Sequence, residues 1–539
     1  MIQPLTSNSS LINKFNLKDA TLYYYNQRPM LNIETFSDAL NTALWRDYLK
    51  PFACIIADNN SDDVILVRDH IGLEPLYYCH HQGKKLLFAQ SIPEILKQLP
   101  STPPLLESQI DMLFSQHKFY SDETHYQGIY RVEPGHMMHF KSNGTIVKKA
   151  FWRLDPHQPM LDYKNEQDYH DHFSMLMTES LRHATDNQSN IAAEFSAGLD
   201  SSSIYCAAAN LDIKPTLYMH IASPGSISAN SYKVDYENAF IEHYQLTDIQ
   251  RIGAENFIPL NVFKDYATLF AGPAPYLFPM FANPLHQAVA AGKHSILLSG
   301  FGGDQCLSGQ LPVNFFLPEL LKLGEYQQAW QSLSNTNKIK KALLLAKHLH
   351  PVLYEMALNL KVSKRQFNNL YKSTKQSLLV HPYERMYYTT VREAECSLLQ
   401  GRDSHEVRMR IEYSSVISKK MGFEYRYPLL YPKLLEFMLR VPTIEKRRDG
   451  KGRYLIRQYL SQNLPHDIFS SYRKKDGLGI VPSTFDLFQN QFEQGYYQND
   501  FFNLPYQQKV KHKEQAIELR NSIKAYMLKS GVESSICFP

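Results

Sequence analysis

Paired cysteines, long apolar runs and an excess of charge of one sign are all missing from this chain of 539 residues. Its six cysteines are scattered without a Cys-x-x-Cys pair, which excludes a disulfide framework and a zinc motif of that kind and predicts a reducing, cytoplasmic location. No stretch approaches the roughly 20 apolar residues of a membrane span, and the first residues lack the apolar core of a signal peptide. With 57 basic and 53 acidic residues, the net charge of +4 is too small to predict nucleic acid as a partner.

The first part of the chain consists of short apolar segments separated by turns. Phe52–Ala57, Val64–Val67 and Leu86–Ala89 have the length and composition of strands. Gly128–Phe140 and Gly144–Trp152 flank a Ser-Asn-Gly turn and form the arms of a predicted hairpin. This pattern predicts a β-rich N-terminal domain.

Beyond the polar stretch Asp155–Gln167, which is a plausible linker, strand-like and helix-like segments alternate. Such alternation predicts a parallel sheet with helices on its faces. The predicted elements are the helix Tyr169–Ala184, the strands Ile191–Phe195 and Thr216–Ile221, the helix Tyr236–Tyr244, the strand Ser295–Leu298 and a helical region from Leu317 to Leu378.

The segment Ser196–Ser202 joins a predicted strand to a helix-like run and is rich in hydroxyl groups. A turn at such a junction presents backbone N–H groups and the positive end of a helix dipole, both of which favour phosphate. Asp200 would repel bare phosphate, so its presence predicts a bridging Mg²⁺. The alternative interpretation is a capped helix without a ligand, since Asp and Ser are ordinary N-cap residues.

A second loop, Ser299–Asp304, follows the predicted strand Ser295–Leu298 and contains three glycines. Ligands of parallel sheets bind beyond the carboxyl ends of the strands, so both loops are placed for one site. Asp200 and Asp304 on one Mg²⁺ would hold a triphosphate or pyrophosphate. Gly300 and its neighbours allow close approach of a ligand, or else form an ordinary tight turn.

Taken together, these motifs resemble the asparagine synthetase B superfamily, which also includes β-lactam synthetase. The segments that carry the resemblance, in family order, are Arg68–Tyr78, Val132–His136, Ser196–Ser201, Ser299–Asp304, Glu424–Leu430 and Arg473–Lys475. The resemblance implies an α/β protein with a class II glutaminase-like domain of the N-terminal-nucleophile hydrolase type at residues 1–155. It further implies an ATP-pyrophosphatase domain at residues 165–539, similar to adenine nucleotide α-hydrolases, with a parallel sheet, many helices, and ATP and Mg²⁺ as cofactors.

The chain departs from the family pattern at Ile2, Ala197 and Phe301, and at Gln305, which replaces an acid that often follows the loop aspartate. The family's glutaminase uses a Cys directly after the initiator Met, where Ile2 stands here, so we expect no glutamine hydrolysis. Asparagine synthetase carries Glu, and β-lactam synthetase Tyr, at the position of Phe301, which can neither accept a proton nor hold an ammonium ion. Ala197 replaces a family glycine and adds a methyl group to the first loop.

Lasso peptide cyclases are members without glutaminase activity, and their second loop resembles Gly300–Asp304. The resemblance therefore implies a macrolactam synthetase that adenylates an Asp or Glu side chain of a precursor peptide, which the peptide's N-terminal amine then attacks. A leader-binding protein and a cysteine protease are the implied partners. Two other functions stay open: amide synthesis with free ammonia or a small amine, and a non-catalytic scaffold of a peptide-processing complex.

Each candidate site residue has an expected role in this chemistry. Lys475, in a basic stretch that is otherwise a solvated loop, is expected to stabilise the charged intermediate. Glu412 and Glu424 are candidate bases for the amine, and a packed Glu424–Arg426 ion pair is the alternative for Glu424. Asp200 and Asp304 are the expected metal ligands. The expected nucleotide-binding residues are Phe195, Ser196, Gly198, Asp200, Ser201, Ser202, Ile221 (beside the adenine), Ser299 and Gly300.

Overall fold

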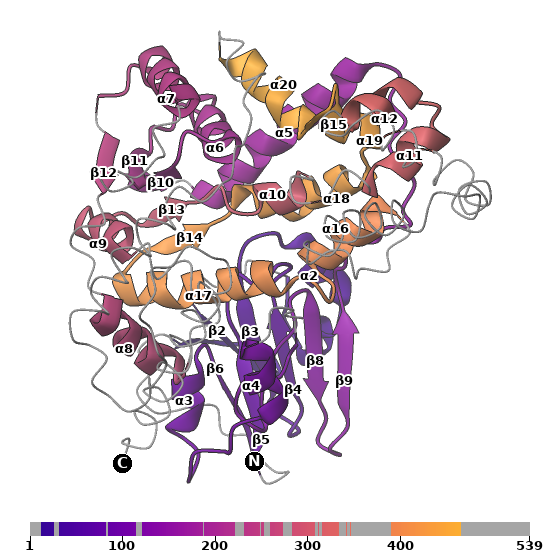
Figure 1. Ribbon diagram of the computed structural model, residues 1–539. Coiled ribbons are helices and arrows are strands. Elements are labelled where there is room, and N and C mark those ends of the chain that lie inside the picture. Colours follow the sequence, from indigo (N-terminus) through magenta and orange to yellow (C-terminus); the bar gives the residue numbers. More distant parts are fainter. Residues whose placement is uncertain are drawn as a thin grey trace, which may run out of the picture.

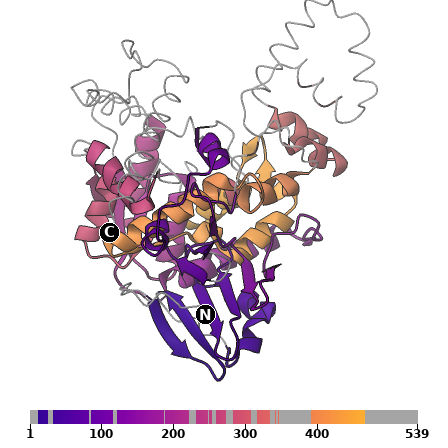
Figure 2. The ribbon, with the colours of Figure 1, turned by 90° about the horizontal axis from the view of Figure 1, so that it is seen from below.

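The structure is a computed structural model that describes residues 12–25, 32–81, 85–114, 121–186, 188–220, 231–247, 249–252, 259–272, 283–307, 311, 315–333, 341, 345 and 390–464. The N-terminal strands, in indigo and purple, gather at one end of the molecule, and the later helices and strands lie beyond them (Figure 1, Figure 2).

Two antiparallel sheets form the N-terminal part. The larger has the strand order β1-β2-β3-β4-β8-β9, and the smaller has the order β6-β5-β7. The strands are β1 (Ile12–Asn16), β2 (Ala20–Tyr25), β3 (Ala53–Asp58), β4 (Val64–Arg68), β5 (Tyr77–His81), β6 (Lys85–Ala89), β7 (Ile129–Arg131), β8 (His136–Phe140) and β9 (Ile146–Ala150). The helices are α1 (Phe36–Ala39), α2 (Thr42–Asp47), α3 (Ile92–Leu96) and α4 (Glu107–Phe114).

Side chains of β3 alternate between two hydrophobic clusters, as the two-residue period of a strand requires. Ile55 packs with Tyr78 and Phe88 of the smaller sheet. Cys54 and Ile56 belong to the main core, which continues into the C-terminal part of the chain. The larger sheet is therefore covered on both faces, which is why the apolar runs at β3 and β4 are nearly continuous rather than alternating.

The predicted hairpin around Ser142–Gly144 is confirmed by the pairing of β8 with β9, but its first arm begins too early, because Gly128–Phe140 holds two strands of different sheets. β7 pairs with β5, whereas β8 pairs with β4 and β9. The chain changes sheet around Gly135, which has a φ of 71° and whose Cβ would lie 2.6 Å from the carbonyl oxygen of Trp152. Only glycine tolerates both this positive φ and this close contact with the carbonyl oxygen. The break between β7 and β8 therefore falls at this residue.

The C-terminal part is built on a parallel sheet with the order β12-β11-β10-β13-β14. Its strands are β10 (Ile191–Phe195), β11 (Thr216–His220), β12 (Ile249–Ile252), β13 (Ile296–Leu298) and β14 (Glu424–Arg426), and a short hairpin, β15 (Arg447–Arg448) with β16 (Lys451–Gly452), lies apart from it. The predicted α/β class is confirmed.

Helices surround this sheet on both sides (Figure 1). The helices of this part of the chain are α5 (Glu166–Thr185), α6 (Leu199–Ala209), α7 (Ser231–Tyr244), α8 (Pro259–Phe270), α9 (Asn283–Ala291), α10 (Gly303–Cys306), α11 (Leu317–Lys322), α12 (Tyr326–Ser332), α16 (Val391–Leu399), α17 (His405–Met421), η4 (Pro428–Leu430), α18 (Pro432–Arg440), α19 (Thr443–Lys446) and α20 (Tyr454–Asn463). Helix α5 begins inside the predicted linker, because Asn165 and Asp168 form a capping box there. Within the described ranges, no helix has the length and apolar character needed to cross a bilayer.

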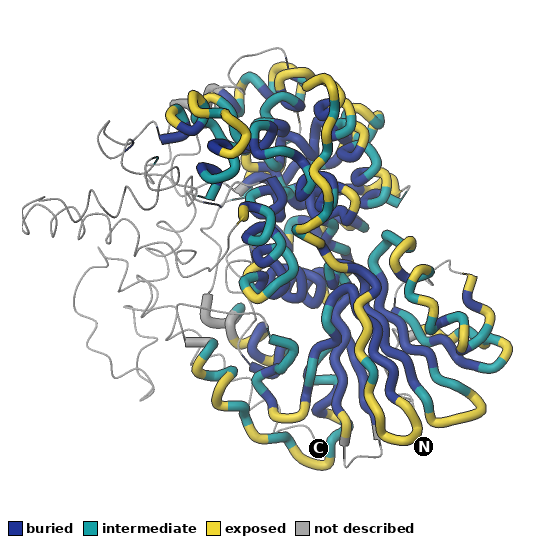
Figure 3. Tube along the Cα trace, turned by 90° about the vertical axis from the view of Figure 1, so that its right-hand side faces the viewer, coloured by how far each residue is buried: buried dark blue, intermediate teal, exposed yellow. Residues whose placement is uncertain are grey.

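Helix α17 lies between the parallel sheet and the N-terminal strands (Figure 1). Lys419, near its end, forms an ion pair with Glu74, and Glu412, near its middle, accepts from Arg131 at 2.9 Å. Helix α17 is buried along most of its length, and buried segments run continuously from the N-terminal strands into the helical part (Figure 3). The two parts of the chain therefore share one packed interface rather than a flexible link.

Candidate active site

The two glycine-containing loops lie against each other at the carboxyl edge of the parallel sheet. Strands β10 and β13 are hydrogen-bonded neighbours with Ala193 opposite Leu298, so the loops that follow them start side by side. A Cβ atom at Gly300 would lie only 3.0 Å from the backbone nitrogen of Ser201. The close packing of the loops thus depends on the missing side chain at position 300.

The first loop turns from β10 directly into α6. Strand β10 ends at Phe195, whose ring packs against Phe240 in the core, and Gly198 caps the helix without a side-chain hydrogen bond. Ser201 Oγ accepts from the backbone nitrogen of Ser196 and lies 3.2 Å from the Ser196 hydroxyl. Helix N–H groups without a side-chain cap, next to two hydroxyls, offer a set of donors suited to phosphate.

The other hydroxyls of the loop face inward. Ser202 is fully buried, and the Ser203 hydroxyl donates to the carbonyl oxygen of Asp200 at 2.8 Å. The structure therefore leaves Ser196 exposed, whereas Ser201 and Ser202 are buried within the turn.

Ala197 stands in the left-handed region, with a φ of 51°, and is fully buried. A β-branched side chain at such a φ costs of order 1–3 kcal/mol of strain, and here the added methyl groups also have no exposed surface to occupy. We expect Ala197→Val to weaken nucleotide binding about tenfold or more, where a factor of ten corresponds to ~1.4 kcal/mol, and Ala197→Gly to retain it.

Titration with a fluorescent ATP analogue measures this effect, and the thermal midpoint of each variant reports its folding. A Val variant that binds ATP like the parent chain would contradict the strain at Ala197.

Asp200 and Asp304 converge on one cation. Nη1 of Arg453 lies 2.8 Å and 2.9 Å from the two carboxylate oxygens of Asp200, and its Nη2 forms an ion pair with Asp304. The Arg453 side chain is only 8% exposed. Two carboxylates from loops about a hundred residues apart in the sequence thus share a single positive charge at the sheet edge.

The second loop is shaped to make this approach possible. Gly303 lies directly against Asp200, whose carboxylate would clash with any Cβ at position 303. Gly302 has a φ of 99°, and a Cβ there would lie 2.5 Å from Leu430. These two glycines let α10 begin beside Asp200, which brings its first-turn residue Asp304 to the same point.

The donor set at this point fits Mg²⁺. Both ligands are carboxylates, which Mg²⁺ prefers, and Mg²⁺ is commonly held by one or two carboxylates together with phosphate oxygens. The Arg453 guanidinium lies between the two carboxylates, so both side chains already face one cation. Asp200 and Asp304 are therefore the residues that would hold the metal.

A buried polar layer supports the second loop from below. Glu194 accepts from the hydroxyl of Ser299 and, at 2.8 Å, from the hydroxyl of Tyr425. Arg410 lies 3.6 Å from the Glu194 carboxylate. Ser299 is fully buried, so its hydroxyl positions the loop and accepts from the backbone nitrogen of Phe301 at 3.2 Å.

Phe301 forms an aromatic wall beside this layer. Its ring lies 5.9 Å from the ring of Tyr427, edge to face, and the Arg410 guanidinium lies 5.4 Å from its centroid. A fixed cation over an apolar ring does not favour a small ammonium substrate at the same position. The arrangement suits an apolar or neutral part of a larger substrate.

The two candidate bases lie elsewhere. Glu412 bridges the N-terminal part of the chain, with one oxygen accepting from Tyr77 and the other from Arg131 at 2.9 Å. Glu424 pairs in register with Ile296, at the amino end of β14, and forms an ion pair with Arg426. These placements favour structural roles for both, including the ion-pair alternative for Glu424.

Two other expected residues, Ile221 and Lys475, lie outside the described residues.

Sequence reasoning did not identify Arg453 or Arg410 as site residues. Arg453 follows a two-stranded hairpin and has a φ of 60°, so its side chain reaches Asp200 from about 250 residues away. No local pattern signals such a contact. Arg410 lies inside α17, which is buried along most of its length, and the side chain is only 4% exposed, although the sequence alone favours an exposed arginine.

Comparisons with known proteins match both parts of the chain. Residues 45–152 match a family described as a glutamine amidotransferase domain, and residues 172–496 match a family described as asparagine synthase. The chain is 25% identical over 306 residues to Amidase chry2 of Gibberella zeae, covering 55% of this chain and 44% of that protein. It is 24% identical over 309 residues to Amidase chyE of Penicillium rubens, covering 55% and 45%. The chain thus spans somewhat less than half the length of these curated relatives.

Proposed function

Because this chain belongs to the asparagine synthase family, we propose that it is an ATP-dependent carbon–nitrogen ligase that releases AMP and pyrophosphate. The observation that carries the proposal is the meeting of Asp200 and Asp304 at one cation, where the loops after β10 and β13 touch. A nucleotide triphosphate held there would contact the hydroxyls of Ser196 and Ser201 and the N-terminus of α6.

The chemistry proceeds in two steps. A substrate carboxylate attacks the α-phosphorus of ATP, which gives an acyl-adenylate and releases pyrophosphate. An amine nitrogen then attacks the acyl carbon, AMP leaves, and the amine loses a proton. Mg²⁺ held by Asp200 and Asp304 supplies positive charge to the phosphate oxygens when bound. Arg453 and Lys475 are the chain's own cations for the charge on the phosphates and on the intermediate.

The acceptor we propose is a peptide that carries both reacting groups. In this reading an Asp or Glu side chain of a precursor peptide is adenylated, and the peptide's own N-terminal amine closes a macrolactam, as in lasso peptide cyclases. Phe301 and Tyr427 give the second loop an aromatic wall suited to a peptide segment. Holding both groups of one molecule together replaces a bimolecular step by an intramolecular one.

We further propose that the N-terminal part does not hydrolyse glutamine. Burial raises the pKa of each of the five cysteines that the structure describes, so none of these thiols is a ready nucleophile. Cys54, for example, is fully buried within β3. A leader-binding protein and a cysteine protease are the partners that a macrolactam pathway would require.

A second candidate is amide synthesis with free ammonia or a small amine. Both fungal relatives are named amidases, and the region that each matches covers 55% of this chain. These names indicate amide chemistry but do not name the acceptor. Arg410 beside Phe301 is the feature that weighs against a free ammonium ion.

The experiment that separates these functions uses the purified chain with ATP and Mg²⁺ in parallel reactions. One contains synthetic peptides with a free N-terminus and an internal Asp or Glu, one contains aspartate and ammonium, and one contains aspartate and glutamine. Loss of one water from a peptide together with AMP supports cyclisation. AMP with aspartate and ammonium alone supports the second candidate. Absence of AMP in every reaction, with partner proteins added, would overturn both in favour of a scaffold.

Lys475→Ala is expected to retain ATP binding and to reduce amide formation about 10²-fold or more, because the cation that offsets charge in the transition state is lost. Lys474→Ala, its neighbour of equal charge, is the matched control and is expected to keep most of the activity. Equal rates in the two variants would show that Lys475 has no special role. AMP and amide are both measured by mass spectrometry.

A further inference from the structure

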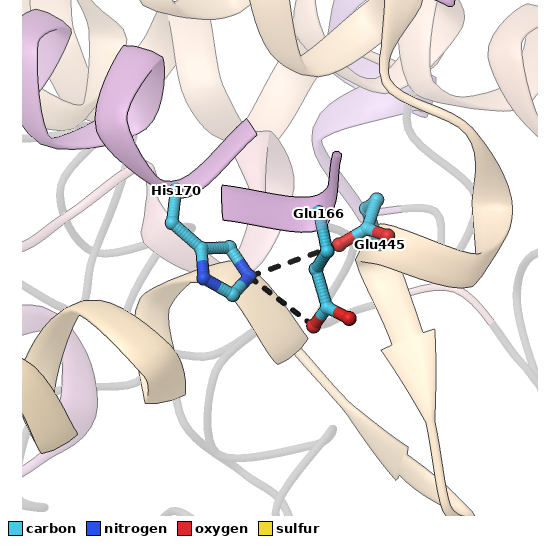
Figure 4. A group of neighbouring side chains, drawn as sticks. All are labelled: Glu166, His170 and Glu445. Carbon is cyan, nitrogen blue, oxygen red and sulfur yellow. Dashed lines mark ion pairs between the residues drawn. The ribbon is translucent and has the colours of Figure 1, made fainter. Parts of the chain in front are cut away.

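Three potential metal ligands from two distant helices meet beside the hairpin that leads to Arg453 (Figure 4). Nε2 of His170 lies 3.5 Å from Oε1 of Glu166 and 3.9 Å from Oε2 of Glu445. One ligand atom from each residue lies within 4.8 Å of the other two. The candidate site already described does not use these side chains.

The helix geometry explains how they come together. Glu166 is the first residue of α5, and His170 lies one turn later on the same face. Glu445 comes from α19, which is nearly three hundred residues further along the chain. Only the tertiary fold brings its carboxylate to this face of α5.

Two of these atoms are buried without a hydrogen bond. His170 is 8% exposed and Glu445 is 4% exposed. Nε2 of His170 and Oε2 of Glu445 have no hydrogen-bond partner within the described part of the chain. Leaving buried polar atoms unsatisfied costs about 1–3 kcal/mol each, so a pair aimed at the same point calls for a ligand.

The separations fit a cation better than direct hydrogen bonds. At 3.5 Å and 3.9 Å the atoms are too far apart for good hydrogen bonds, whose heavy-atom distances are about 2.7–3.2 Å. Ligand atoms at about 2.0–2.1 Å from a tetrahedral Zn²⁺ lie roughly 3.3 Å from one another. Contraction of the three ligand atoms, which lie within 4.8 Å of one another, would therefore close the cluster around one ion.

Arg448 and Tyr454 hold the carboxylates in place. Arg448 donates to Oε1 of Glu445 at 2.7 Å and forms an ion pair with Oε1 of Glu166 at 2.6 Å, and the Tyr454 hydroxyl donates to the same Glu166 oxygen at 2.6 Å. Oε2 of Glu445 stays directed to His170. Hydrogen bonds that orient ligating carboxylates are a normal outer layer of protein metal sites.

We propose that Glu166, His170 and Glu445 bind a divalent transition-metal ion, with Zn²⁺ the best chemical match, at a site separate from Asp200 and Asp304. Imidazole nitrogen and carboxylate oxygen are both ligand types that Zn²⁺ accepts in proteins. The ion links α5 to α19. Tyr454 directly follows Arg453 in the sequence. The ion therefore also fixes the start of α20, from which Arg453 reaches the two aspartates.

The test uses the full chain, freed of metal by dialysis against a chelator and kept in excess Mg²⁺. Titration with Co²⁺ alone, followed by its visible absorption, and with Zn²⁺ alone, followed by calorimetry, reports binding. We expect one equivalent of each ion to bind and the thermal midpoint to rise. His170→Gln and Glu445→Gln are expected to weaken binding about 10–100-fold or more.

His172→Gln, on the same helix but hydrogen-bonded to Tyr163 at 2.6 Å, is the matched control and is expected to bind like the parent chain. Asp304→Asn is also expected to bind normally, which separates this site from the candidate active site. If His170→Gln does not fold, Glu166→Gln provides the comparison, because Glu166 is 42% exposed and its substitution disturbs the core least. No bound equivalent, or unchanged affinity in a folded ligand variant, would overturn the proposal.

Discussion

Replacing Asp304 by Asn is expected to lower the rate of ATP–pyrophosphate exchange about 10²- to 10³-fold. The substitution keeps the shape of the side chain but removes one of the two carboxylates that meet at Arg453. A site with half its negative charge binds Mg²⁺ less well and neutralises less of the charge that develops on the phosphates. Asp200→Asn is expected to have an effect of the same order.

Asp212→Asn is the matched control. Asp212 is exposed and follows α6, the helix whose first turn contains Asp200. The φ of 58° at Asp212 suits Asn as well as Asp. We expect this variant to exchange pyrophosphate at the parent rate. Thermal unfolding of all three variants distinguishes lost chemistry from lost folding, since Asp200 and Asp304 also pair with Arg453. Exchange within tenfold of the parent rate in folded Asp304→Asn would refute the assigned metal site.

Replacing Glu412 by Gln is expected to destabilise the chain by about 3–5 kcal/mol, because it leaves the buried guanidinium of Arg131 without its counter-charge. This pair joins α17 to β7, so the loss falls on the interface between the two parts of the chain. The urea midpoint, followed by tryptophan fluorescence, is expected to shift to lower concentration. Trp152 is a suitable reporter, since its indole donates to Glu436 across the same interface at 2.7 Å.

A double variant separates the structural role of Glu412 from a catalytic one. Arg131→Met combined with Glu412→Leu removes both charges and is expected to recover much of the lost stability. We expect the double variant to retain amide formation once folded. Normal stability of Glu412→Gln together with loss of amide formation would instead identify Glu412 as the base.

The elements that the sequence predicted well are those in which the apolar pattern is set by burial on both faces. β10 was predicted at its observed bounds, the predicted strands at β4, β6, β11 and β13 differ from the observed ones by one residue at one end, and that at β3 differs by one residue at both ends. The β14 strand was not predicted, because only three residues pair and they come two residues after Gly422, which ends α17. Its partner β13 lies more than a hundred residues earlier, and short strands depend on such partners more than on their own sequence.

The residues predicted for the site differ in the same way. Asp200 and Asp304 were identified because each lies in a glycine- and hydroxyl-rich loop after an apolar strand, a pattern confined to a few consecutive residues. Glu412 and Glu424 were considered as bases because a free carboxylate can accept a proton. Their ion pairs with Arg131 and Arg426 became visible only in the folded chain.

The sequence alone determined the α/β class, the two loops at the strand ends and the family resemblance, since each depends on periodicity or on residues adjacent in the chain. The tertiary structure decided which charges meet: Arg453 with Asp200 and Asp304, Arg131 with Glu412, and Glu445 with His170. Coulomb interactions act through space and leave no local pattern, so a partner hundreds of residues away becomes known only when the backbone has placed it within a few ångströms.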